Sequence, residues 1–66
     1  NYITRDESGD LWLFENRPFK NGWSWYVLDG FGENINSYKH LFKMVKWGDE
    51  APTLISDLLE VNNNEQ

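Results

Sequence analysis

The residue types that perform acid–base or nucleophilic chemistry are present in this chain, but their spacing matches no catalytic arrangement. His40 is the only histidine, and its neighbours Lys39 and Leu41 supply neither a nucleophile nor an orienting carboxylate. None of the serines stands in a Gly-x-Ser-x-Gly motif, the glycine-flanked turn that exposes a catalytic hydroxyl group. Cysteine is absent, which excludes a thiolate nucleophile and a disulfide. We therefore expect His40 to be an ordinary surface histidine and predict no catalytic residue.

Carboxylates are abundant, and two clusters of them stand at positions that favour turns: Asp6, Glu7 and Asp10 form one, and Asp49 and Glu50 the other. Two carboxylates act as an acid–base pair when a desolvated cleft separates their pKa values. Polar turns do not provide such a cleft. We expect solvated charges here, and we predict that the chain is not an enzyme.

The segment from Asp29 to Asn34 combines carboxylate and amide oxygens with two glycines, as ion-binding loops do. It lacks the alternating acids and the distal glutamate of a calcium loop. Its glycines also lack the Lys-Ser/Thr pair that completes a phosphate-binding loop. We predict no metal site and no cofactor.

Aromatic residues dominate the composition, since Phe, Trp and Tyr make up 17% of the 66 residues. A domain of this size buries only about 60% of the surface that its unfolded chain exposes, so its core has little room for so many rings. Surface Trp and Tyr residues are typical of protein interfaces. The rings therefore form either an unusually ring-rich closed core or an exposed face that meets a partner.

Short strands are the elements that must position these rings. Tyr2–Arg5 and Leu11–Glu15 flank a polar turn that contains Gly9, and together they predict a β-hairpin. Trp23–Leu28 is rich in aromatic residues and predicts the third strand of an antiparallel meander, apolar on both faces. Ile35 is expected to begin a short fourth strand.

The hydrophobic period changes after Ser37. Tyr38, Leu41, Phe42 and Val45 have the i, i+3, i+4, i+7 spacing of one helix face. The alternative is one or two helical turns followed by a strand over residues 44–47. Residues 52–61 predict either a second helix with proline in its first turn or a strand.

These elements predict a single domain over residues 1–61, followed by a disordered polar tail at residues 62–66. The expected fold class is α+β or mainly β. It is a small antiparallel meander of three to five strands, SH3-like or half-barrel in shape, with one or two short helices in the C-terminal half.

The net charge of −5 disfavours nucleic acid and anionic membranes as partners. No apolar run approaches the roughly 20 residues of a membrane span. The charge is uneven, because residues 36–48 carry three lysines and no acid, whereas residues 49–66 carry five acids and no lysine or arginine. Either the two segments neutralise each other, or an acidic face meets a basic groove on a partner. No signal peptide is visible, so we expect a cytoplasmic location.

Two runs of the sequence carry a likeness to known proteins. The first is Tyr2-Ile3-x-Arg5-Asp6-x-x-Gly9-x-Leu11-x-Leu13-Phe14 with Arg17-Pro18, and the second is Leu41-Phe42-x-x-Val45-Lys46-Trp47-x-Asp49-Glu50-x-Pro52. The chain resembles a class of short uncharacterised proteins encoded by phages, prophages and their bacterial hosts. It departs from that pattern at Lys43-Met44 and in its leucine-rich segment after Pro52. The resemblance implies that the expected cytoplasmic location is in a bacterial host, and it carries over no functional residue.

The leading hypothesis is a non-enzymatic protein-binding module, with a phage-encoded inhibitor of a host protein as its specific form. Its predicted contact surface is an aromatic sheet face with an acidic rim, formed by Trp12, Phe19, Trp23, Trp25, Tyr26, Asp6, Glu7, Asp10, Asp49 and Glu50. The first alternative is a structural or accessory protein whose aromatic face is a homo-oligomer interface. The second is a single-stranded nucleic-acid binder, whose rings would stack on bases.

Overall fold

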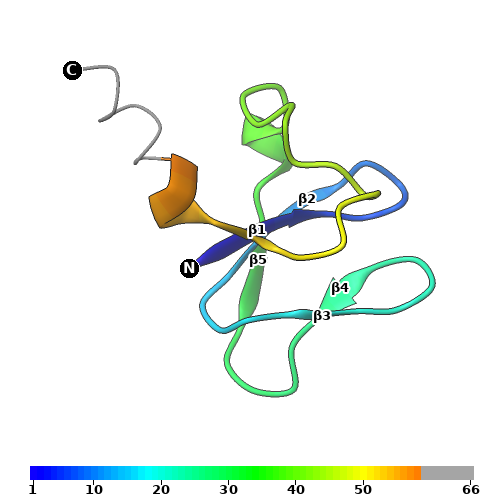
Figure 1. The fold of residues 1–66 in the computed structure, drawn as a ribbon, viewed down its shortest axis with the longest axis vertical. Helices are drawn as coiled ribbons and strands as arrows, with labels where there is room; N and C mark the ends of the chain where they lie inside the picture. Colours follow the sequence, from blue (N-terminus) through cyan, green and yellow to red (C-terminus); the bar gives the residue numbers. More distant parts are fainter. Residues whose placement is uncertain (59–66) are drawn as a thin grey trace.

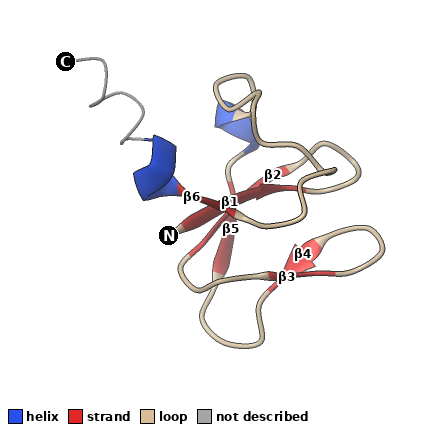
Figure 2. Ribbon diagram, in the orientation of Figure 1, coloured by secondary structure: helices blue, strands red, loops and turns tan. Residues whose placement is uncertain are grey.

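The computed structural model describes residues 1–58 of the chain, and the predictions made for the leucine-rich end and the polar tail beyond residue 58 lie outside the described residues. Within them the elements are β1 (Tyr2–Arg5), β2 (Leu11–Phe14), β3 (Phe19–Lys20), β4 (Trp25–Tyr26), β5 (Gly32–Asn34), the 3-10 helix η1 (Asn36–Tyr38) and β6 (Thr53–Leu54). A helical turn over residues 55–58 follows β6 (Figure 2).

The strands form two separate antiparallel sheets. Four of them make an open sheet in the order β5-β2-β1-β6, and β3 pairs with β4 in a hairpin beside it (Figure 1). The predicted class, a small antiparallel β domain with a short helix near its C-terminus, is confirmed. Among residues 1–58 the strands do not close into a barrel.

The predicted hairpin over residues 2–15 is confirmed. The pairing of β1 with β2 runs from Tyr2 opposite Phe14 to Arg5 opposite Leu11. Gly9 has a φ of 98°, which suits glycine and closes the turn between the two strands. The main-chain N–H of Asp6 donates to the carbonyl of Asp10 at 2.9 Å and locks the base of this turn.

The prediction that Trp23–Leu28 forms the third strand of the meander is wrong. Only Trp25 and Tyr26 are extended, and they pair with β3, while β5 takes the place beside β2. The cause is a local turn: the Asn21 side-chain oxygen accepts hydrogen bonds from the main-chain N–H groups of Trp23 (2.9 Å) and Ser24 (2.8 Å). This Asx-type turn folds β4 back onto β3.

The predicted α-helix over residues 38–45 is also wrong. η1 ends at Tyr38, and tight turns follow, in which Leu41 donates to the Tyr38 carbonyl and Val45 to the Phe42 carbonyl. Each of these bonds spans three residues, as in a 3-10 turn, instead of the four of an α-helix. The alternative of one short helical piece is closer to the structure, although residues 44–47 form no strand.

Arg5 on β1 explains why the helix does not form. Its guanidinium donates to the main-chain carbonyls of Val45 at 2.7 Å, Gly9 at 2.9 Å, and Lys39 and Phe42 at 3.1 Å each. In an α-helix the carbonyls of residues 39 and 42 would accept from N–H groups four residues later. Here a side chain distant in sequence takes those bonds and holds residues 39–45 as a loop against the sheet.

The core lies between the four-stranded sheet and this loop. Ile3, Leu11 and Val45 are buried at its centre, and the partly buried side chains packed around them are Leu13, Ile35, Phe42, Ile55 and Leu58. Of the predicted helix face, Phe42 and Val45 therefore enter the core, whereas Tyr38 and Leu41 are exposed. No helix within residues 1–58 is long and apolar enough to cross a membrane.

Candidate interaction surface

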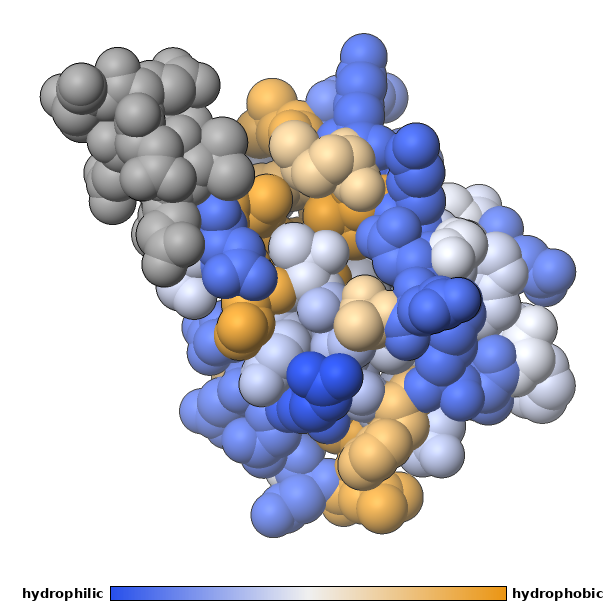
Figure 3. Space-filling model, viewed as in Figure 1, coloured by the Kyte–Doolittle hydropathy of each residue, from blue (hydrophilic) through white to orange (hydrophobic). Residues whose placement is uncertain are grey.

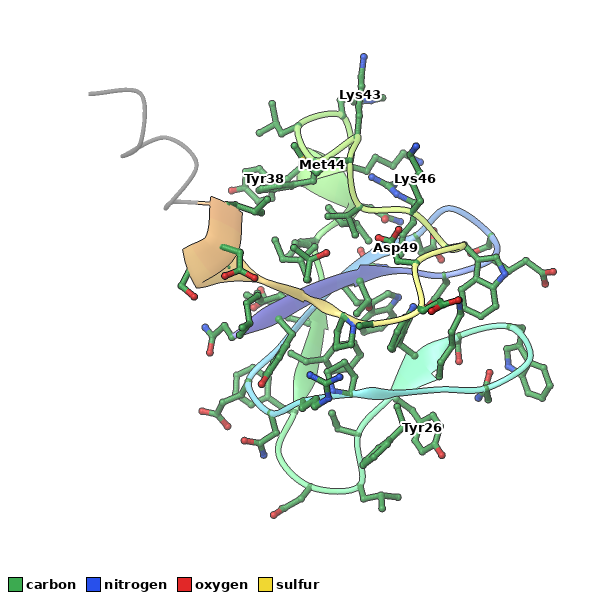
Figure 4. The ribbon with its side chains drawn as sticks, in the orientation of Figure 1. Tyr26, Tyr38, Lys43, Met44, Lys46 and Asp49 are labelled. Atoms are coloured by element: carbon green, nitrogen blue, oxygen red, sulfur yellow. The ribbon has the colours of Figure 1, made fainter. Side chains whose placement is uncertain are left out.

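The β3–β4 hairpin turns one face outward and the other toward the body of the protein. Phe19 and Tyr26 are paired across it, and their exposed rings lie 5.9 Å apart between centroids. The next pair, Lys20 and Trp25, points to the opposite face because side chains alternate along a strand. Figure 4 shows Tyr26 pointing away from the four-stranded sheet.

The inner face anchors the hairpin. Trp25 is only 6% exposed, and the Lys20 ammonium lies 5.4 Å from its ring centroid and 4.2 Å from that of Trp47. The same ammonium donates to the main-chain carbonyls of Trp47 and Asp49. Lys20 is exposed, and a cation over an indole ring at an exposed site stabilises such a contact by about 0.5–1 kcal/mol.

Two of the predicted contact residues therefore do not lie on the outward face. Trp25 is a buried anchor in this structure. Trp12 lies on β2 in the other sheet, half-buried, with its ring 6.2 Å from that of Phe14 in a stacked arrangement. Its place is fixed by the β1–β2 pairing, which sets it opposite Thr4.

The outward residues define what we call the hairpin surface: Phe19, Trp23 and Tyr26, with Leu28 and Phe31 in the loop that follows β4. All five side chains are exposed, and Trp23 keeps 68% of its area accessible. Figure 3 shows hydrophobic residues gathered at the lower edge of the view, where this loop lies. Sequence reasoning missed Leu28 and Phe31. The available signal was the position of Phe31 between two glycines, which favours a turn over a packed strand.

The two predicted acidic clusters flank this hairpin. In the β1–β2 turn, the Glu7 main-chain N–H donates to the Trp23 carbonyl at 3.2 Å, and the Asp6 carboxylate accepts from the Trp25 N–H at 3.1 Å. On the other flank, Lys20 reaches the Asp49 carbonyl at 2.9 Å. The structure therefore brings both acidic turns against one hairpin.

The five acids do not play equal parts in that rim. Glu7 and Glu50 are exposed. Asp10 is half-buried and accepts from the Asn36 side-chain amide at 2.8 Å, and an Asp49 carboxylate oxygen accepts from the Lys46 main-chain N–H at 3.1 Å. Among the described residues, the three aspartates of this set thus use their carboxylates in hydrogen bonds within the protein, whereas the carboxylates of the two glutamates make none.

Asp6 is the acid most altered by its surroundings. Burial raises the pKa of its carboxyl above the ordinary 3.8, the hydrogen bond from the Trp25 N–H opposes this rise, and the nearby Asp10 charge adds to it. The Trp12 indole also lowers this pKa slightly, although its N–H makes no hydrogen bond of ordinary geometry. Asp6 therefore connects the β1–β2 turn to β4 through the hydrogen bond that its carboxylate accepts.

Two hollows lie elsewhere on the described part of the molecule. An apolar groove of about 280 Å³ is lined by Ile3, Leu13, Ile35, Tyr38, Leu41, Phe42 and Ile55. A larger pocket of about 430 Å³ has a basic lining formed by Arg5, Lys39, His40, Lys43 and Lys46, completed by Gly9, Val45 and Trp47. Among residues 1–58, no group of three His, Asp or Glu side chains is placed to hold a metal ion.

Comparison with known proteins gives no match, since no protein-family model, no curated protein and no solved structure shows significant similarity to this chain.

Proposed function

We propose that this chain is a non-enzymatic protein-binding module that contacts its partner through the hairpin surface. The observation that carries the proposal is the two-sided hairpin: its inner face is fixed by Trp25 and Lys20, and its outer face presents the adjacent rings of Phe19 and Tyr26 to solvent. Rigid, exposed aromatic side chains lose little conformational entropy on binding, which makes them effective interface anchors.

The acidic flanks favour a different protein over a second copy of this chain as the partner. A two-fold symmetric dimer places each surface against itself. The acids beside the surface, among them Glu7 and Asp29, would then face a surface that carries the same acids, and like charges that face each other weaken association. A partner with a basic rim around an apolar depression complements both features of the surface.

A more specific form of this proposal is an inhibitor that acts in the bacterial cytoplasm on a host protein with a basic groove. Two features support it: the resemblance of the sequence to phage-type proteins, and the acidic turns on both flanks of the hairpin. Acidic side chains around an apolar centre would speed encounter with a basic groove, and this rate advantage falls as salt concentration rises.

The test compares large hydrophobic residues matched in exposure. Trp23→Ala truncates an exposed side chain on the hairpin surface, and Leu41→Ala truncates one of equal exposure, 67%, on the opposite part of the molecule. Partners are captured with the wild-type chain, and their affinities for purified wild type and both variants are measured by calorimetry. An interface anchor contributes about 2 kcal/mol, so Trp23→Ala should weaken binding roughly 30-fold. Leu41→Ala should leave the affinity within about twofold.

A second pair, Tyr26→Ala and Tyr38→Ala, repeats this comparison with one residue type. Equal losses for both tyrosines, or a loss confined to Tyr38→Ala and Leu41→Ala, would contradict the assignment of the surface. Sedimentation of the wild-type chain alone should show a monomer. A dimer that dissociates on Trp23→Ala would show that the hairpin surface binds a second copy instead.

A further inference from the structure

The basic pocket is the second chemically distinctive place on the molecule. It lies between the β1–β2 turn, which contributes Gly9, and the loop of residues 39–47. Four of the six lysines and arginines of the chain line it, together with the only histidine, and no carboxylate is among the lining residues. Figure 4 shows Lys43 and Lys46 on this loop, apart from Tyr26 and the hairpin surface.

Arg5 gives this pocket a defined shape. Its four hydrogen bonds to the carbonyls of residues 9, 39, 42 and 45 tie the β1–β2 turn to the loop that carries the lysines. The guanidinium is occupied by these carbonyls, so Arg5 acts as a positioning residue with a positive charge at the base of the pocket. The lysines are the groups that remain able to turn toward a ligand.

Asp49 is the first acid after this loop, and its carboxylate forms no ion pair with the lysine side chains among the described residues. Asp49 directs a carboxylate oxygen to the main-chain N–H of Lys46, and its main-chain carbonyl accepts from Lys20. The net charge of −5 repels anions only at long range, because screening limits such effects to about 10 Å at 0.1 M salt. Four cationic side chains line the pocket itself, and the nearby carboxylates of Asp10 and Asp49 reduce their positive charge without cancelling it.

We propose that this pocket binds a small phosphorylated molecule of the nucleotide or organic-phosphate class. Lys39, Lys43 and Lys46 would bind the phosphate oxygens through charge-assisted hydrogen bonds. Trp47, which is partly exposed, supplies the apolar wall against which the organic part would pack. A volume of about 430 Å³ falls within the range of small-molecule sites, roughly 300–1,000 Å³. This proposal is independent of the hairpin surface and of any protein partner.

The experiment titrates the full chain with ADP and with inorganic pyrophosphate by calorimetry at about 0.1 M ionic strength. We expect saturable binding of one ligand per chain, with ADP bound more tightly than pyrophosphate because only ADP uses the apolar wall. Lys43→Gln removes one lining charge and should weaken ADP binding about tenfold, the effect of one charge-assisted contact. Arg17→Gln removes an exposed charge outside the pocket and should change the affinity less than about twofold.

Three results would overturn the proposal. The first is the absence of saturable binding of both probes at millimolar concentration by the folded wild-type chain. The second is an equal loss for Lys43→Gln and Arg17→Gln, which would show a non-specific charge effect. The third is single-stranded DNA binding that strengthens with oligonucleotide length and far exceeds ADP binding, which would make the pocket part of a nucleic-acid surface. Circular dichroism of both variants confirms that the fold is retained.

Discussion

Replacement of Arg5 by glutamine should be among the most damaging polar substitutions in this chain. The Arg5 side chain makes four hydrogen bonds to main-chain carbonyls, and three of these bonds are partly buried. A buried acceptor that loses its donor costs about 1–3 kcal/mol. The Phe42 carbonyl keeps the Val45 N–H as a donor, so the Gly9 and Val45 carbonyls are the partly buried acceptors that lose theirs, and at the lower end of this range the loss is about 2 kcal/mol. A domain of this length has a total unfolding free energy of roughly 3–10 kcal/mol, so the loss is a large share of it.

The assay is urea unfolding followed by tryptophan fluorescence. The control is Arg17→Gln, because it removes the same charge from an exposed side chain that makes no hydrogen bond to any of residues 1–58. Arg5→Gln should lower the midpoint while the dependence on urea stays the same. Arg5→Lys keeps the charge but not the planar fork, and should recover only a minor part of the loss. A decrease below about 0.5 kcal/mol for Arg5→Gln, the level of an ordinary surface substitution, would refute the role assigned to Arg5.

Three further predictions concern residues around the hairpin and the sheet. Trp25→Ala should lower the unfolding free energy by about 3–5 kcal/mol, because it empties a buried site, whereas Trp23→Ala should change it by less than about 0.5 kcal/mol in the same urea titration. Gly32→Ala should cost about 1–3 kcal/mol, because its new Cβ would overlap a buried phenyl ring of β2, while Gly48→Ala, which has open space around it, serves as the control. Asp6→Asn keeps the acceptor oxygen for the β4 N–H but removes a charge whose pKa is raised by burial. The wild type should therefore lose stability relative to this variant as the pH rises through that raised pKa. The two should match in unfolding experiments below about pH 3 and differ near pH 7; a wild type more stable than the variant at pH 7 would contradict this sign.

The parts of the fold that local sequence determines were predictable. The β1–β2 hairpin depends on two apolar strands and a glycine with positive φ, and all of these signals lie within residues 2–14. The prediction of an α-helix over residues 38–45 was wrong because the interaction that competes with helix formation is not local. Arg5 lies 34 to 40 residues before the carbonyls of Lys39, Phe42 and Val45 that it binds. A hydrophobic period cannot reveal such a donor.

The candidate surface could be predicted only in part, because it too depends on contacts between residues that are distant in the sequence. Strand alternation separates Tyr26 from Trp25, but it does not tell which face is buried. That choice depends on Lys20, which lies over the rings of Trp25 and Trp47 and belongs to β3, a strand that the sequence analysis did not predict. The acidic turns were identified as clusters, whereas their placement on the two flanks of one hairpin depends on contacts of the β1–β2 turn with Trp23 and Trp25 and of Asp49 with Lys20.

The measurement that most directly tests the proposed function is amide hydrogen exchange of the chain, alone and bound to the partner found by the matched-variant comparison. The proposal predicts slower exchange on binding for amides of residues 19–31, which carry the hairpin surface, with little change over residues 36–45. Slower exchange confined to residues 36–45, with the hairpin amides unchanged, would contradict it and would place the protein-binding site at the apolar groove or the basic pocket.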